Sequence, residues 1–134
     1  MPSPEIAPYG SWKSPLSSDL IVAETVRLGL PTLDGDDLYW VESRPREKGR
    51  SVIVRRSGDG TTRDLTPPPF SVRSRVHEYG GGAFVVLAGT LYFSNFADQR
   101  IYRQAPGGPP CPITPEAPLR YADYAIDAAR KGEA

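Results

Sequence analysis

Two stretches of this sequence can be laid over each other without a gap, and this repeat constrains the fold more than any other feature. Residues 53–67 align with residues 101–115 at a constant offset of 48. Each copy begins with isoleucine, passes through a glycine-containing turn and ends with a branched aliphatic residue followed by Thr-Pro. Further upstream, residues 33–39 match residues 87–92 at an offset of 53 to 54. The first copy is longer in the loop at 44–49, where an insertion costs little free energy. A repeat of about 50 residues predicts successive copies of one supersecondary unit.

Each copy contains four short segments in which apolar and polar residues alternate, as they do in strands. The expected strands of the first copy are residues 28–33, 38–42, 51–55 and 61–65, and those of the second copy are residues 83–87, 91–95, 100–103 and 111–114. Turn residues separate them, which agrees with the 15 prolines and 13 glycines of the 134-residue chain. Four short strands joined by tight turns predict an antiparallel meander.

A four-stranded unit of about this length is typical of a β-propeller blade. One such sheet has two faces that need cover, and neighbouring blades supply it. We therefore predict an all-β fold, an incomplete β-propeller of about two four-stranded antiparallel blades plus the start of a third. The alternative is a two-sheet β-sandwich in which the internal similarity is accidental. A propeller normally closes with about four to eight blades, so the sequence reads as a piece of a larger protein.

The predicted organisation has four parts. Residues 1–27 form an N-terminal arm, rich in proline at its start, with a possible short helix in its second half. Residues 28–67 form blade one and residues 68–116 blade two. Residues 117–134 are the start of a truncated blade three. Within the arm, Tyr9 and Trp12 are expected to anchor on an apolar surface.

Charge and hydropathy exclude several classes of protein. The chain has 16 basic and 16 acidic residues, and 39% of its residues are hydrophobic. This balance argues against a disordered tail and against a dedicated nucleic-acid binder, which needs a basic surplus. No apolar run approaches the roughly 20 residues of a membrane span, and the first residues do not resemble a signal peptide. The chain has a single cysteine, Cys111, which excludes an internal disulfide and fits a reducing compartment. From charge, hydropathy and cysteine content together, we expect a cytoplasmic protein that contacts neither membrane nor nucleic acid.

A search for catalytic chemistry yields no catalytic residue. The sequence has no Gly-x-Ser-x-Gly motif. The one histidine, His77, lacks the second histidine that a zinc-protease helix requires at position 81. Asp34, Asp36 and Asp37 resemble part of a calcium loop but are read as a polar hairpin turn, because the glutamate at the twelfth position is missing. The basic residues between 44 and 56 are read as a solvated hairpin face, with an acidic partner as the alternative. We therefore predict no metal and no cofactor.

Four segments carry a resemblance to a known family. Residues 9–15, 33–40, 73–83 and 92–100 resemble bacterial acylaminoacyl-peptidase and dipeptidyl-aminopeptidase-like members of the prolyl oligopeptidase family. The resemblance runs over roughly residues 9–127. It implies a serine peptidase in which an N-terminal propeller, commonly seven-bladed, sits over a C-terminal α/β-hydrolase domain with a Ser, Asp and His triad. No triad residue can be carried over to this sequence.

The resemblance also implies partners and candidate residues. The substrates of the parent enzyme would be short peptides, because the propeller restricts access, and the arm would pack on the α/β-hydrolase domain of the same parent chain. His77, Glu78 and Tyr79 are candidates to face the cavity or the substrate, with a polar interblade loop as the alternative. Three structural glycines follow them, Gly80, Gly81 and Gly82. Glycine has no Cβ, so these residues are expected to allow positive φ where the chain enters a crowded strand. A phosphate-binding loop is not expected, because no helix pattern follows the glycines.

The favoured hypothesis is a substrate-gating propeller fragment of a serine peptidase, without catalytic residues of its own. Whether this chain alone counts as an enzyme stays uncertain on the sequence. The alternatives are a non-enzymatic propeller-type binding module and a self-sufficient small β domain. On either propeller hypothesis, the isolated fragment is expected to be weakly stable or to self-associate through its unpaired strand edges and outer faces.

Overall fold

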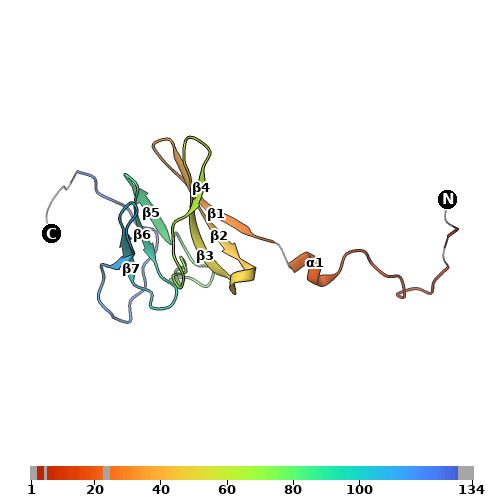
Figure 1. The fold of residues 1–134 in the computed structure, drawn as a ribbon. Helices are drawn as coiled ribbons and strands as arrows, with labels where there is room; N and C mark the ends of the chain where they lie inside the picture. The colour runs from red at the N-terminus through yellow and green to blue at the C-terminus, as the bar shows by residue number, and fades with distance from the viewer. Residues whose placement is uncertain (1–2, 5, 23–24, 130–134) are drawn as a thin grey trace.

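Two four-stranded antiparallel sheets make up the body of the molecule (Figure 1). The computed structural model describes residues 3–4, 6–22 and 25–129. The first sheet contains β1 (Arg27–Asp34), β2 (Asp37–Arg44), β3 (Arg50–Arg56) and β4 (Thr62–Asp64). The second contains β5 (Phe84–Leu87), β6 (Thr90–Ser94), β7 (Ile101–Gln104) and β8 (Cys111–Pro112). In both sheets the spatial order follows the chain order, so each is a meander, and the predicted fold of about two propeller blades is confirmed.

The repeat seen in the sequence is also a repeat of hydrogen bonds. In blade one, the N–H of Ile53 donates to Thr66 Oγ1 at 3.1 Å, and the carbonyl of Ile53 accepts from the N–H of Leu65 at 2.8 Å. In blade two, the N–H of Ile101 donates to Thr114 Oγ1 at 3.0 Å. Both pairs are related by the offset of 48 residues. The Thr-Pro ends of the two copies therefore have the same function, which is to hold the segment after the fourth strand against the third strand.

The fourth strands are shorter than the sequence predicts. β4 has three residues and β8 has two, whereas residues 61–65 and 111–114 were expected. Proline explains the short β8, because Pro109, Pro110 and Pro112 have no backbone N–H to donate to a ladder. The longer loop of blade one contains η1 (Pro45–Glu47), a single turn of 3-10 helix that closes on Lys48 with a φ of 57°.

The hydrophobic core lies between the two sheets. Its buried members come from both blades and from the segments that lead into them: Tyr39, Ile53, Val72, Ala83, Phe84, Val86, Leu91, Phe93 and Tyr102. Phe70 packs at the edge of this cluster, with its ring 4.9 Å from the ring of Tyr102. Because side chains alternate along β2, Tyr39 faces blade two while Leu38 and Trp40 lie on the opposite face of the sheet.

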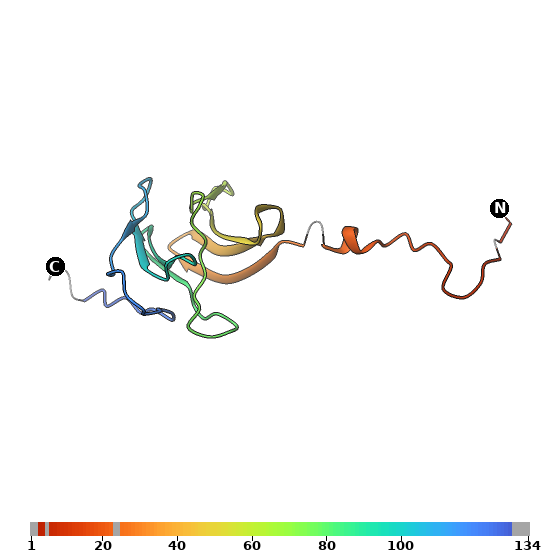
Figure 2. The same ribbon diagram turned by 90° about the horizontal axis from the view of Figure 1, so that it is seen from below.

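Polar contacts also join the two blades. The carboxylate of Asp34, at the end of β1, accepts hydrogen bonds from the N–H groups of Ala88 and Gly89 in the β5–β6 turn. A second polar contact across the seam joins Gln104 Nε2, which donates, to the carbonyl of Leu65 at 2.8 Å. Seen from below, the two sheets lie side by side as neighbouring layers (Figure 2).

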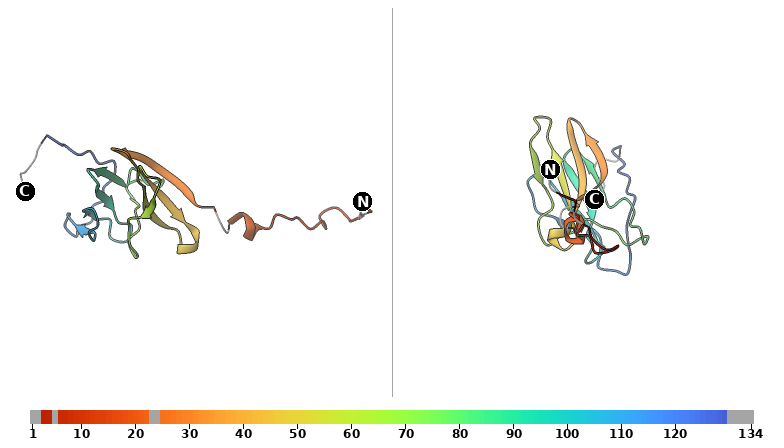
Figure 3. Two further views of the ribbon diagram at one scale, coloured as in Figure 1. Left: turned by 45° about the horizontal axis from the view of Figure 1, so that its top comes forward. Right: turned by 90° about the vertical axis from the view of Figure 1, so that its right-hand side faces the viewer.

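The N-terminal arm extends away from both sheets (Figures 1 and 3). It contains one short helix, α1 (Ser18–Val22), and the Ser17 hydroxyl accepts a hydrogen bond from the N–H of Leu20 at 3.0 Å. Tyr9 and Trp12 are exposed, and Trp12 Nε1 donates to the carbonyl of Ala7. The structure therefore leaves these aromatic rings without an apolar surface among the described residues.

The segment after β8 forms no strand among the described residues up to 129. It runs back against blade two instead, where the carbonyl of Tyr121 accepts hydrogen bonds from the hydroxyls of Ser74 and Ser94. That residues 117–134 begin a third blade stays a prediction, and residues 130–134 lie outside the described part of the chain.

Candidate functional site

The segment that joins the two blades is bonded to both of them. The N–H of Val72 donates to the carbonyl of Ser51 in blade one at 2.9 Å. One residue later, the N–H of Arg73 donates to the carbonyl of Ser94 in blade two at 3.1 Å. The start of this connection is therefore held at two points before the chain leaves the core.

Residues 73–75 continue as extended chain whose side chains alternate between the interior and the solvent. Ser74 is fully buried, and its hydroxyl donates to the carbonyl of Tyr121 at 2.6 Å. The N–H of Arg75 donates to Gln99 Oε1 at 2.7 Å. With Ser74 anchored inward, the side chains of Arg73 and Arg75 are both exposed.

These two arginines line a hollow of about 350 Å³. Phe96 lies beneath both guanidinium groups, with Arg75 Cζ 4.1 Å and Arg73 Cζ 5.2 Å from the ring centroid. Such cation–π contacts hold a guanidinium over the ring while leaving its N–H groups free to bind. A third arginine, Arg120, lines the same hollow and donates through Nη1 to the carbonyl of Arg75 at 2.9 Å.

The three arginines have no carboxylate partner within the described part of the chain. None of the ion pairs recorded there includes Arg73, Arg75 or Arg120. The hollow therefore concentrates positive charge beside an aromatic ring, which is an arrangement suited to an anionic group.

The candidates named from the sequence lie at this hollow or next to it. His77 and Glu78 line it, whereas Tyr79 projects into solvent and stacks on the His77 ring, with centroids 4.8 Å apart. The backbone of His77 pairs with that of Gly80 in both directions, at 3.1 and 2.9 Å, which closes a tight turn around Glu78 and Tyr79. That these side chains contact substrate stays a prediction.

The three glycines connect this turn to β5. Gly80 and Gly81 have φ values of 102° and 137°, where residues with a Cβ are strained. Gly82 pairs with Asp123: its N–H donates to Asp123 Oδ1 at 2.8 Å and its carbonyl accepts from the N–H of Asp123 at 2.8 Å. Gly82 does not have the expected positive φ. A Cβ on Gly82 would lie 2.7 Å from Asp123 Oδ1, so the Asp123 carboxylate would have to shift.

Sequence reasoning missed the arginines and Phe96 as site residues. The signal that points to the arginines is the alternation of residues 72–76, in which Arg73 and Arg75 flank Ser74 and an apolar residue stands at each end. Arg120 could not be found in this way, because it lies 45 residues further along the chain and reaches the hollow only through the fold.

The basic stretch between residues 44 and 56 is largely neutralised by neighbouring carboxylates. Arg44 pairs with Glu42 at 2.8 Å, and its contacts with Asp64 raise the pKa of the guanidinium and lower that of the Asp64 carboxyl. Arg50 pairs with Glu47 at 2.6 Å. These pairs favour the interpretation of a structural hairpin face over that of a surface for an acidic partner.

No catalytic or metal-binding constellation is visible in residues 3–4, 6–22 and 25–129. No group of three or more His, Cys, Asp or Glu side chains there is placed to hold a metal ion. The imidazole of His77 stacks on the ring of Tyr79, and within the described ranges no hydrogen bond joins it to a serine.

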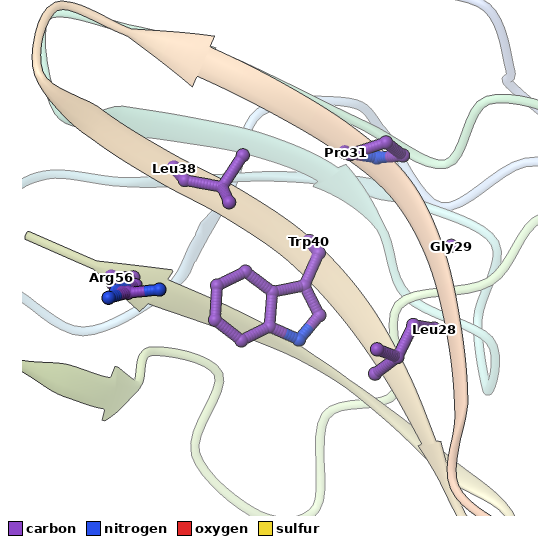
Figure 4. Close-up of a pocket in the computed structure, with 6 residues that line it drawn as sticks. All are labelled: Leu28, Gly29, Pro31, Leu38, Trp40 and Arg56. Carbon is purple, nitrogen blue, oxygen red and sulfur yellow. The ribbon is translucent and has the colours of Figure 1, made fainter. Parts of the chain in front are cut away.

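A second hollow, of about 330 Å³, lies on the face of blade one that is turned away from blade two (Figure 4). It is lined by Leu28, Gly29, Pro31, Leu38, Trp40 and Arg56. The Trp40 indole lies across the strands here, and its Nε1 donates to Glu42 Oε1 at 3.1 Å. Leu28, which lines the hollow from β1, is 68% exposed, so the apolar lining is open to solvent.

Solved structures of two puromycin-hydrolyzing proteins contain a region similar to this chain. A puromycin hydrolase is 38% identical to the chain, with a TM-score of 0.80, and the match covers 92% of this chain and 21% of that one. A puromycin-hydrolyzing peptidase of Mycobacterium tuberculosis is 42% identical, with a TM-score of 0.82, and the match covers 92% of this chain and 20% of that one. The chain belongs to the prolyl oligopeptidase family, as part of its β-propeller.

This member of the prolyl oligopeptidase family spans about one fifth of the length of the solved structures that it matches. No model of a protein family matches the chain, and no curated protein does. None of the helices in the described part of the chain is both long enough and apolar enough to span a bilayer.

Proposed function

We propose that this chain forms the part of a propeller that limits access of substrates to the active site of a serine peptidase acting on short peptides. The observation that carries the proposal is the match to two puromycin-hydrolyzing proteins at 38 and 42% identity over 92% of the chain. A match of this quality over blades that pack in the same way supports a shared role. On this proposal the chain contributes no catalytic residue.

The chemistry would take place elsewhere in the larger protein. A serine hydroxyl would attack the peptide carbonyl, a histidine would act as the base, and backbone N–H groups would bind the oxyanion. The contribution of this chain would be steric. Blades one and two share a buried core and polar contacts across their seam, so they would form a rigid part of the wall around the cavity. A short peptide would enter that cavity and a folded protein would not.

Two exposed apolar surfaces support the proposal that this chain is one part of a larger protein. The apolar hollow around Trp40 would be covered by a further blade on the outer side of blade one. The exposed Tyr9 and Trp12 of the arm would pack on the α/β-hydrolase domain. Without these partners, the same surfaces and the free strand edges would lead the isolated chain to self-associate. The exposed free thiol of Cys111 is compatible with a reducing cytoplasm.

A chimera tests this role directly. The segment of puromycin hydrolase that matches this chain is replaced by residues 9–127, and hydrolysis of a short chromogenic peptide is measured together with that of a folded protein. We expect the chimera to cleave the peptide at a rate within about tenfold of the parent, and to leave the protein intact. A folded chimera that cleaves neither substrate would contradict the proposed role.

The isolated chain provides the complementary measurement. Purified residues 1–134 should not hydrolyse the same chromogenic peptide. Turnover by the isolated chain that is blocked by a serine-directed inhibitor would show that the chain contains a catalytic centre, and would overturn the proposal.

A further inference from the structure

The hollow beside the interblade segment brings three arginine side chains together on one surface. Arg73 and Arg75 contact the ring of Phe96, and Arg120 donates to the backbone carbonyl of Arg75. Elsewhere in the described residues, the half-buried arginines Arg44, Arg50 and Arg55 pair with carboxylates, as Arg55 does with Asp37 at 2.6 Å. The guanidinium groups at the hollow therefore keep N–H donors that no recorded carboxylate occupies.

The backbone around the hollow is held in place by the fold. The N–H groups of Arg73 and Arg75 are bonded to Ser94 and Gln99 of blade two, at 3.1 and 2.7 Å. Ser74, between them, is anchored through Tyr121. A site whose backbone is preorganised in this way loses less conformational entropy when it binds a ligand.

The size of the hollow and the charges that line it limit which ligands it could bind. A volume of about 350 Å³ is at the lower end of the range for small-molecule sites, so it suits a ligand of two or three residues better than a long chain. The planar guanidinium forks match a carboxylate, and the Phe96 ring offers an apolar floor. Glu78 lines the same hollow and supplies an opposite charge for an amino group.

We propose that the hollow formed by Arg73, Arg75, Arg120 and Phe96 binds the free C-terminal carboxylate of a short peptide, with Glu78 facing its amino group. The inference rests on the proposed function, because it names the feature of a short peptide that this part of the propeller would recognise. It would make the propeller a selective element that favours peptides with a free C-terminus, in addition to excluding large substrates.

Binding of triglycine to the full 134-residue chain tests the inference, at a concentration at which light scattering gives the mass of the monomer. Two-dimensional NMR titration follows the side-chain Nε–H signals of Arg73 and Arg75 at fixed ionic strength. We expect triglycine to shift these signals and to bind at least tenfold more tightly than triglycine amide, which lacks the carboxylate. Acetylation of the amino terminus of triglycine should weaken binding less than amidation does, because one carboxylate faces three arginines.

Matched variants separate a site from a general effect of charge. Arg75→Gln should weaken triglycine binding at least fivefold and remove the preference over the amide, whereas Arg103→Gln, an exposed arginine on β7, should leave both unchanged. The backbone spectra of both variants should overlay that of the parent. Arg73→Gln provides a second variant should Arg75→Gln disturb the fold.

Three results would overturn the inference. They are equal binding of triglycine and its amide, loss of binding in Arg103→Gln to the same extent as in Arg75→Gln, and inorganic phosphate binding more tightly than triglycine at the same signals. The last result would assign the hollow to phosphate groups. Because these measurements use binding rather than hydrolysis, their failure leaves the chimera experiment unaffected, and an inactive chimera leaves the binding result standing.

Discussion

The carboxylate of Asp34 accepts a hydrogen bond from the backbone N–H of Gly89 at 2.7 Å, across the seam between the two blades. Its other oxygen accepts from the N–H of Ala88 at 3.2 Å. Asp34 and Ala88 occupy the same position in the two copies of the repeat, each between a leucine and a glycine. The turn of one blade thus holds the corresponding turn of the next, and alanine at that position in blade two has no side-chain oxygen to repeat the contact.

Substitution of Asp34 tests how much this contact stabilises the seam. Hydrogen bonds to a charged group contribute about 1.5–3 kcal/mol, and partial exposure reduces this, so Asp34→Ala is expected to lower the free energy of unfolding by about 1–2 kcal/mol. Urea unfolding followed by tryptophan fluorescence measures the change. Asp36→Ala, an exposed residue in the same turn, serves as the control and should change stability by less than about 0.5 kcal/mol.

The two threonines of the repeat allow a comparison inside one molecule. Thr66 is fully buried, so Thr66→Val leaves the N–H of Ile53 without a partner and is expected to destabilise the chain by about 1–3 kcal/mol. Thr114 makes the equivalent bond to Ile101 but is partly exposed, so water can replace its hydroxyl. Thr114→Val should therefore cost less than half as much. Equal losses in urea unfolding would show that burial does not set the difference.

A methyl group on Gly82 should disturb the contact with the C-terminal segment. Gly82→Ala places Cβ against Asp123 Oδ1, so we expect a loss of about 1–3 kcal/mol, the range for overpacking, and a displacement of residues 121–124. Hydrogen exchange of the Asp123 N–H reports the displacement. Gly29→Ala, where a Cβ meets no atom within 4 Å, should leave that exchange unchanged.

Tyr102 should make the fold sensitive to alkaline pH. Burial, together with a 2.6 Å hydrogen bond to Asp98, raises the pKa of its hydroxyl to about 12, from 10.0. The fold therefore favours the neutral phenol, so its contribution to stability is complete below pH 10 and is lost as the pH rises from 10 through about 12. Urea unfolding at pH 9 and pH 11 measures the loss.

Tyr102→Phe should reduce this alkaline loss without removing it. Burial also raises the pKa of Tyr39 and of Tyr124, so those two side chains retain some sensitivity. A variant whose stability falls between pH 9 and pH 11 as steeply as that of the parent would show that Tyr102 does not contribute.

Much of the architecture could be predicted because its signals are local. Alternation along β2 placed Tyr39 and Trp40 on opposite faces, and the aligned Ile53 and Ile101 indicated two copies of one unit. The predicted fourth strands were longer than the observed ones. For β8 the reason is that alternation of apolar and polar residues carries no information on backbone donors, which proline lacks.

The amino-acid sequence alone determined the strand pattern, the repeat and the family, because the side-chain period of two and the chemistry of turns act between near neighbours. Only the tertiary structure decided that His77 and Glu78 share a hollow with Arg73, Arg75 and Arg120, and that Asp34 bonds to Gly89. These groups lie up to 55 residues apart, and their meeting depends on how one sheet packs against another. That packing is set by the shape of the shared core, a property of the folded chain as a whole.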